Sequence, residues 1–197
     1  MVGSYPAGMT ASTDRLPFTG DADADRLLVS SPLALLIGFA LDQQVTVQKA
    51  FSGPAELQRR IGHLDAAQIA ATDPEQLATV FRTPPALHRF PGSMAGKVQA
   101  LCAAIATDYS NDAGAVWTTA SDGADLKRRL LALPGIGAMK ADGIIAILAK
   151  RLGVELPGLA EVMPDHPTLG DVDSPEALAE YQAGKRAKKA AARAAQG

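Results

Sequence analysis

The segment LPGIG, residues Leu133 to Gly137, limits the possible folds of this chain more than any other stretch. Before it, leucines recur at the three-to-four-residue spacing of an amphipathic helix, and a second stretch with the same spacing follows it. Pro134 and Gly135 end the first helix, and the second helix begins directly after Gly137. The sequence therefore predicts two helices joined by a tight hairpin.

Helix signals recur along the rest of the chain, whereas strand signals do not. Aromatic residues, which favour strands, make up only 5% of the sequence, and helix-capping residues stand before most apolar-periodic stretches. We therefore predict an all-α fold. The predicted helix starts are Ser31 with Pro32, Asp65, Asp73 with Pro74, Ser93, and Ser174 with Pro175.

Composition narrows the class of protein further. A length of 197 residues with 47% hydrophobic and 20% charged residues is typical of a folded single domain. The single cysteine, Cys102, excludes a disulfide framework or a four-cysteine cluster built from this chain alone, and it indicates a reducing compartment. The longest apolar run, Leu33 to Leu41, is shorter than the roughly 20 residues that cross a bilayer, and residues 1–15 lack the pattern of a signal peptide. We therefore expect a cytoplasmic protein without a membrane partner.

The two glycines of the hairpin leave its backbone accessible. Gly135 and Gly137 flank Ile136, which we expect to point inward, and the amide groups around them can converge on an anion with the help of the second helix's dipole. We expect Lys140, in the first turn of that helix, to reach a neighbouring phosphate. Although the net charge is only -2, residues 127–151 contain six basic residues and one acid. The sequence thus predicts a phosphate-binding hairpin, and a plain helix connection with solvated charges is the alternative.

Two longer stretches resemble a known family. LLALPGIGAMKADGI resembles the helix-hairpin-helix motif of the HhH-GPD superfamily of base-excision DNA glycosylases, and LLIGFALDQQVTVQKAF resembles its early helix with a glutamine pair. The segments between them follow the family's order, so the resemblance covers roughly residues 27–153, and LPFTGDADADRLL is similar to an actinobacterial HhH-GPD-type branch. It implies a compact helical glycosylase domain over residues 27–173, an N-terminal extension over 1–26, and a C-terminal part shortened to a helix and basic tail over 174–197.

The resemblance implies a monofunctional DNA glycosylase, which flips a damaged or mismatched base out of double-stranded DNA and hydrolyses its N-glycosidic bond. For Gln44 a second interpretation stays open, since it continues the helix face of Leu33, Ile37 and Leu41 and would then be a core-edge amide bonded to backbone. The residues expected to contact DNA are Gln43, Gln44, Leu133, Pro134, Gly135, Ile136, Gly137, Ala138 and Lys140.

Glycosidic cleavage develops positive charge on the sugar, so the reaction needs a nearby carboxylate. The resemblance places this aspartate after the second hairpin helix, and Asp165 in PDH lies nearest to the family's pattern. The stretch between Gly137 and Asp165 is about two helical turns longer than is usual in the family. Asp171 and Asp173 are the alternatives, while Asp165 in a turn and Asp173 at a helix start are the purely structural interpretations.

The resemblance also limits the chemistry. Relatives that cut the strand use a lysine two positions after the second hairpin glycine, and Met139 stands there, so we expect no lyase step. We expect no iron–sulfur cluster and no side-chain metal site, while a monovalent cation at the hairpin stays open. The sequence leaves the lesion undetermined and favours a monomer. A non-catalytic helix-hairpin-helix DNA-binding module and a helical scaffold without a DNA role are the competing hypotheses.

Overall fold

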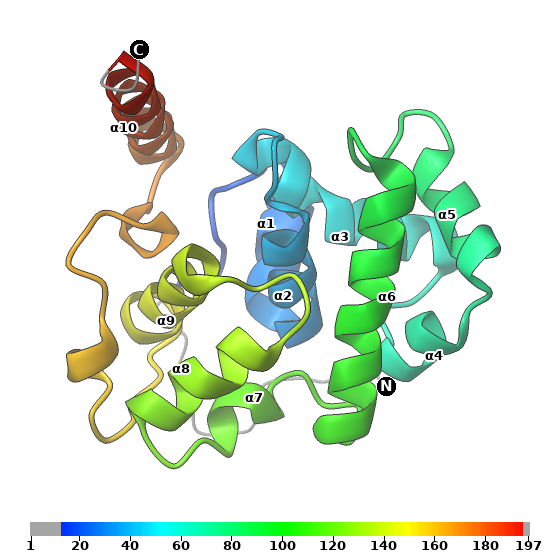
Figure 1. Ribbon diagram of the computed structural model, residues 1–197, viewed down its shortest axis with the longest axis horizontal. Helices are drawn as coiled ribbons and strands as arrows, with labels where there is room; N and C mark the ends of the chain where they lie inside the picture. The colour runs from blue at the N-terminus through cyan, green and yellow to red at the C-terminus, as the bar shows by residue number, and fades with distance from the viewer. Residues whose placement is uncertain (1–12, 195–197) are drawn as a thin grey trace.

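The computed structural model describes residues 13–194, and every regular element in that range is a helix (Figure 1). The all-α prediction is therefore confirmed for the described part of the chain. In chain order the elements are α1 (Ala22–Ser30), α2 (Pro32–Leu41), α3 (Val47–Ile61), α4 (Ala66–Ala71), α5 (Pro74–Arg82), α6 (Pro91–Asp108), α7 (Ala115–Thr118), α8 (Gly123–Ala132), α9 (Ala138–Lys150), the 3-10 helices η1 (Ala160–Val162) and η2 (Leu169–Asp171), and α10 (Pro175–Ala194).

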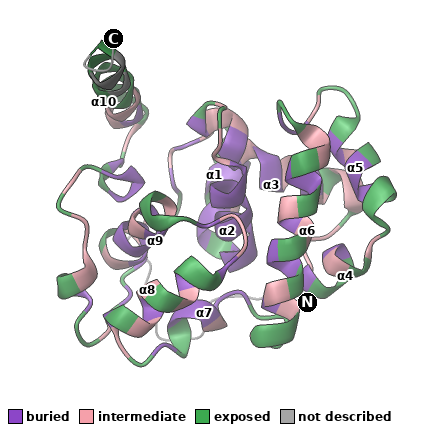
Figure 2. Ribbon diagram, viewed as in Figure 1, coloured by how far each residue is buried: buried purple, intermediate pink, exposed green. Residues whose placement is uncertain are grey.

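Helix α2 forms the centre of the fold. All 10 of its residues are buried, and it packs against α1, α3 and α6 (Figure 2). A helix that is apolar on every side is stable only when neighbours cover it all round, which agrees with this position. Helix α2 ends at Leu41, and the loop with the glutamine pair follows it. The central location of α2 therefore fixes the position at which this loop begins.

Most predicted helix starts are confirmed by their caps. The side chains of Ser31, Asp65, Asp73 and Ser174 each accept a hydrogen bond from a backbone N–H in the first turn, at 2.9–3.2 Å. The start predicted at Ser93 is too late, because α6 already begins at Pro91, whose fixed φ suits the first helical position.

The described part of the N-terminal segment packs into the same core. Leu16 and Phe18 are fully buried, and the buried carboxylate of Asp25 accepts hydrogen bonds from the backbone N–H groups of Phe18 and Thr19. Residue 27, at which we expected the helical domain to begin, lies inside α1. The core therefore includes residues that precede the stretch resembling the family.

Of the last described elements, η2 lies against α9, and α10 contacts η2. A Cβ built on Gly170 of η2 would come within 2.6 Å of the backbone carbon of Ala146, so only glycine allows this close approach. Helix α10 is anchored through buried Leu178 and through Gln182, whose side-chain Nε2 donates to Oε1 of Gln48 at 2.8 Å. The rest of α10 is largely exposed and extends away from the other helices (Figures 1 and 2).

Within residues 13–194 no single helix is both long and apolar enough to cross a membrane. Helices α1 and α2 satisfy the length and composition criteria only as a pair, and this pair is bent by 113°.

Candidate nucleic-acid interface

The hairpin presents the start of α9 with an open backbone. Gly135 has a left-handed φ of +83°, and Ile136 donates its N–H to the carbonyl of Leu133 at 3.1 Å, which closes the turn. Ile136 is only 4% exposed, so its predicted inward orientation is confirmed. Gly137 is the N-cap of α9, no side chain caps this helix start, and a Cβ built on Gly137 meets no atom within 4 Å. The first amides of α9 are therefore accessible from outside.

Lys140 lies differently from our expectation. Its Nζ donates to the carbonyl of Gly135 at 2.9 Å and to that of Ala40 at 3.2 Å. Burial lowers the pKa of Lys140, with the nearby carboxylate of Asp42 acting in the opposite direction. Lys140 thus joins the hairpin to the end of α2. The sequence predicted instead that its side chain points outward and reaches a phosphate.

The glutamine pair follows α2 in a loop. The prediction that Gln44 continues a helical face is wrong, because α2 ends at Leu41 and Gln44 is exposed with a left-handed φ of +57°. Its side chain makes no hydrogen bond with any described residue, so the core-edge interpretation does not apply. Gln43 is partly buried, and its Oε1 accepts a hydrogen bond from Nζ of Lys97 in α6 at 2.5 Å.

A buried histidine joins the glutamine loop to the proline-rich loop ahead of α6. Nε2 of His88 lies 3.1 Å from the carbonyl oxygen of Leu41 and 3.0 Å from that of Gln43, while Nδ1 accepts the N–H of Phe90 at 3.0 Å. These partners require the neutral tautomer with the proton on Nε2. Burial lowers the pKa of His88, which favours the same neutral form.

This connection places an exposed aromatic side chain beside the glutamine loop. Phe90 is 41% exposed, and the guanidinium carbon of Arg89 lies 5.3 Å from the centre of its ring. Sequence reasoning identified this segment as an ordered loop and assigned neither residue to the site. The sequence feature that could have indicated these residues is an arginine–phenylalanine pair in a loop that is rich in proline and therefore stiff.

The basic residues around the hairpin are largely paired with acids. Lys127 binds Asp142 with an N–O distance of 3.0 Å, and Asp125 forms ion pairs with Arg128 and with Arg129. Lys150 forms a further pair with Asp171 in η2. The charge excess counted over residues 127–151 therefore overstates the local positive charge, because Asp125 and Asp171 lie outside that range in the sequence but next to it in space.

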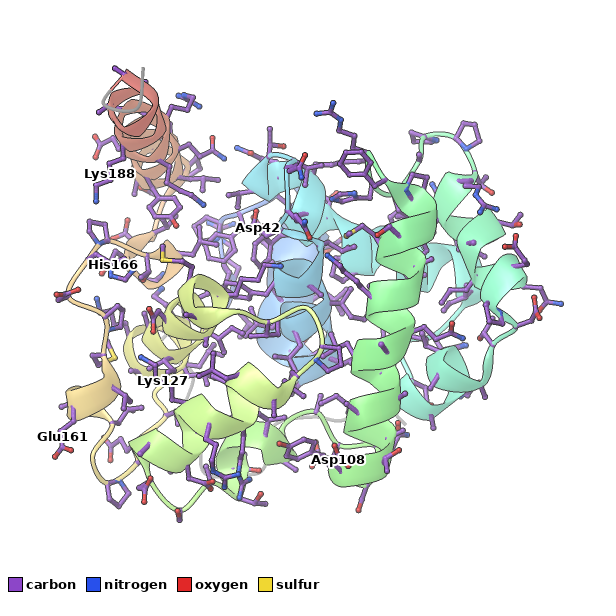
Figure 3. The ribbon with its side chains drawn as sticks, viewed as in Figure 1. Asp42, Asp108, Lys127, Glu161, His166 and Lys188 are labelled. Carbon is purple, nitrogen blue, oxygen red and sulfur yellow. The ribbon has the colours of Figure 1, made fainter. Side chains whose placement is uncertain are left out.

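A pocket of about 160 Å³ opens next to the hairpin. Its wall includes Asp42, which sequence reasoning missed, and Figure 3 labels this residue at the end of α2 and His166 on the segment before η2. Burial raises the pKa of Asp42, an effect that Lys185 and Lys140 partly offset. The lining residues that carry functional groups or aromatic rings are Phe39 within α2, Asp42 directly after α2, Met139 and Lys140 of α9, His166 and Thr168 before η2, and Tyr181 and Lys185 of α10.

The three predicted aspartates are not gathered at this pocket. The side chain of Asp165 is fully exposed, and only its neighbour His166, whose Nδ1 lies 3.4 Å from Oδ1 of Asp165, lines the pocket. Asp171 closes a capping box, accepting the backbone N–H of Thr168 at 2.8 Å, and Asp173 is exposed. Asp171 is therefore committed to holding η2 and binding Lys150.

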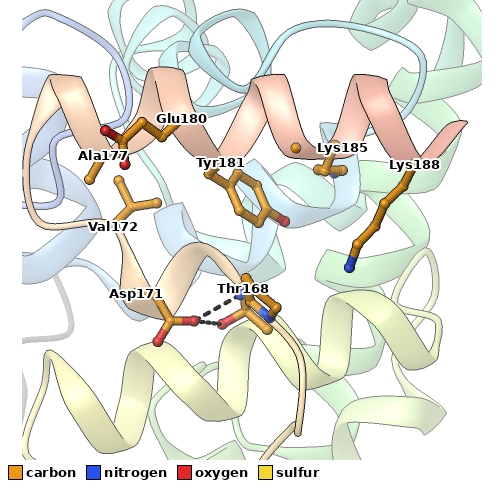
Figure 4. A pocket seen from close by; sticks show the side chains of 10 residues that line it. Thr168, Asp171, Val172, Ala177, Glu180, Tyr181, Lys185 and Lys188 are labelled. Atoms are coloured by element: carbon orange, nitrogen blue, oxygen red, sulfur yellow. Dashed lines mark hydrogen bonds between the residues drawn. The ribbon is translucent and has the colours of Figure 1, made fainter. Parts of the chain in front are cut away.

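A second pocket, of about 330 Å³, lies between η2 and α10 (Figure 4). Figure 4 shows Asp171 bonded to Thr168 on one side of it and Tyr181 on the other. Burial raises the pKa of Tyr181 to about 12, so its hydroxyl stays protonated at neutral pH. Because Tyr181 lines both pockets, α10 contributes directly to the wall beside the hairpin.

Residues 13–194 contain no group of three or more His, Cys, Asp or Glu side chains that could hold a metal ion. Cys102 is buried in α6, and burial raises the pKa of its thiol to about 12. Within the described residues, geometry and fold thus define an all-α protein with an exposed helix start beside a small pocket that has both charged and apolar lining residues. Comparison of the chain with protein-family models and with curated proteins gives no match in either case.

Proposed function

We propose that this chain is a monofunctional DNA glycosylase that binds damaged or mismatched double-stranded DNA. One observation carries the proposal: the uncapped, open start of α9 at Gly137 adjoins a pocket that is lined by two residues of the first helical turn, Met139 and Lys140. A phosphate on the amides at this helix start brings the neighbouring nucleotide close to a pocket of base size.

Hydrogen bonds join the parts of the proposed DNA-binding surface. Lys140 joins the hairpin to Ala40 at the end of α2, and His88 joins the glutamine loop to Phe90. Gln44 is exposed in the same glutamine loop. In the proposed complex the amides hold the backbone without reading sequence. Phe90 and Gln44 supply an apolar ring and a free amide that can occupy the space left in the base stack.

In the proposed reaction a water molecule attacks C1′ of the flipped nucleotide, the C1′–N bond breaks, and its electron pair leaves with the base. The proton released by water is passed to the departing base or to solvent. Asp165, next to His166 at the pocket, remains the proposed carboxylate that stabilises the positive sugar. We propose no Schiff-base step, since Met139 occupies the lysine position of strand-cutting relatives and Lys140 donates to two carbonyls.

A non-catalytic DNA-binding module is the second candidate. It is favoured by the full exposure of Asp165, since a carboxylate in water stabilises a developing cation less than one in a dry site, and by the structural role of Asp171. This candidate keeps the hairpin and its phosphate contacts and lacks base release.

Incubation with duplexes that carry uracil, an alkylated purine, oxidised guanine or a mismatched thymine separates the two candidates. Under the proposed function, at least one duplex shows strand breakage only after alkali, and Asp165→Asn lowers the rate by at least about a hundredfold. Duplex binding without breakage on any substrate supports the non-catalytic module. Absence of duplex binding contradicts both.

A further inference from the structure

The pocket beside the hairpin is lined by the carboxylate-bearing residue Asp42. Asp42 is partly buried, and among the described residues its side-chain oxygens accept no hydrogen bond and form no ion pair within 4.0 Å. Its backbone N–H is satisfied by the carbonyls of Gly38 and Phe39, so the residue is held in place without the carboxylate. A carboxylate turned toward a pocket and removed from most water gains most from a ligand that offers N–H groups.

Positive groups lie on the same wall. The ammonium groups of Lys140 and Lys185 are near enough to Asp42 to oppose the effect of burial on its pKa, and both residues line the pocket. Lys140 donates to two carbonyls, which leaves one of its three N–H groups available. The polar wall thus presents one acceptor pair next to ammonium donors.

Aromatic rings complete the enclosure. Phe39 of α2 and Tyr181 of α10 line the pocket together with the apolar side chain of Met139. The volume of about 160 Å³ is below the ~300–1,000 Å³ of sites for drug-sized ligands and is of the order of one heteroaromatic base. The faces of a planar base in this pocket can pack against the rings and the methionine, and its edge can form hydrogen bonds with the polar wall.

We propose that this pocket binds a guanine-type base, whose two neighbouring N–H donors bond the carboxylate of Asp42 while its O6 accepts from the adjacent lysines. The proposal rests on the base-flipping function proposed above. A guanine edge carries the donors N1–H and N2–H beside the acceptor O6, which matches the pocket's acceptor pair beside ammonium groups. Uracil and thymine have a single N–H donor, N3–H, with a carbonyl on each side, and adenine has an acceptor lone pair at N1. Each of these bases would therefore place an acceptor next to a carboxylate oxygen, and the two would repel each other.

The test uses the full chain without DNA and 7-methylguanine as the probe, with saturation-transfer NMR to measure its affinity against adenine and uracil. We expect 7-methylguanine to bind at least about tenfold more tightly than uracil. Asp42→Asn should lower the affinity for 7-methylguanine by at least about tenfold, because it removes charge-assisted hydrogen bonds. The matched control is Asp108→Asn, an exposed carboxylate at the end of α6 that does not line this pocket, for which we expect a change of less than about twofold.

A second variant guards against a folding defect in Asp42→Asn. Met139 is 67% exposed, so Met139→Trp should fold normally while its larger side chain obstructs the pocket mouth and abolishes probe binding. No 7-methylguanine binding, equal binding of uracil, or unchanged affinity in Asp42→Asn would overturn the assignment of Asp42. Failure of the proposed function can be distinguished from failure of the pocket assignment. If the chain binds no duplex and releases no base, the proposed function fails. If 7-methylguanine binding still depends on Asp42 in that case, the pocket assignment holds.

Discussion

Replacing Gly137 with aspartate sets a carboxylate at the start of α9, among the amides that we propose bind a phosphate. The backbone at this position has φ -94° and ψ 179°, which any residue can adopt, and a Cβ there meets no atom within 4 Å. Aspartate is also a favourable N-cap, so the folded state should gain roughly a few tenths of a kcal/mol relative to glycine. Gly137→Asp is therefore a substitution that the fold tolerates.

The effect on DNA binding should be large. The new carboxylate takes up the first amides of α9, which removes a charge-assisted hydrogen bond to phosphate worth about 1.5–3 kcal/mol. Repulsion between the carboxylate and a phosphate about 4 Å away adds about 1 kcal/mol even at the dielectric of water. Together these terms lower duplex affinity by roughly two to three orders of magnitude.

Fluorescence anisotropy with a labelled duplex at fixed low salt measures this loss, and thermal unfolding checks the fold. Gly137→Asn is the matched uncharged control and should lose less affinity than Gly137→Asp. Gly137→Ala, whose methyl group enters open space, should stay within about threefold of the wild type. Equal duplex affinity in the wild type and Gly137→Asp, with both proteins folded, would refute the role of the hairpin.

Three further predictions concern packing, pH and strand cleavage. Gly170→Ala should lower stability by about 1–3 kcal/mol, seen as a lower Tm, because the new methyl group would lie 2.6 Å from the backbone of Ala146; an unchanged Tm would contradict the close packing. Burial lowers the pKa of His88 in the folded chain, so below about pH 6.5 this histidine becomes protonated in the unfolded chain while it stays neutral in the folded chain. The free energy of unfolding therefore falls as the pH drops below about 6.5. Thermal unfolding of His88→Gln should show a weaker loss on acidification than the wild type, and an identical loss would argue against a buried neutral histidine. Borohydride should trap no covalent adduct with abasic DNA, because Met139 has no amine and Lys140 is bonded to carbonyls; an adduct that disappears in Lys140→Gln would contradict this prediction.

Helix starts in this chain were predictable because a cap and the amide that it binds lie two or three residues apart. Ser31, Asp65 and Asp73 act through such local bonds, and the hairpin turn around Gly135 is equally local. The end of α2 was not predictable in the same way. Its apolar pattern continues to Gln44, but the chain turns after Leu41, where His88, a residue far away in the sequence, bonds the carbonyls of Leu41 and Gln43.

The composition of the candidate site depended on contacts that sequence spacing does not encode. Asp42 belongs to the pocket only because residues of α9 and α10 lie beside the end of α2, which is a long-range contact. Lys140 looked outward by its position in α9, yet the carbonyl of Ala40 lies close enough to hold it inward. Likewise Asp171 matched a catalytic pattern as well as Asp173 did, and its role in the capping box with Thr168 required the fold of η2.

The mass of a lesion-bearing duplex after incubation with the wild-type chain tests the central claim most directly. A duplex with an oxidised or methylated guanine, bound at low salt and analysed without alkali, should show one strand in which the base is replaced by hydroxyl, while both strands stay unbroken. Gly137→Asp, incubated in parallel, should leave the mass unchanged because it does not hold the duplex. A wild-type chain that binds the same duplex through the hairpin and leaves every strand at its original mass, across all lesions tested, would contradict glycosylase activity.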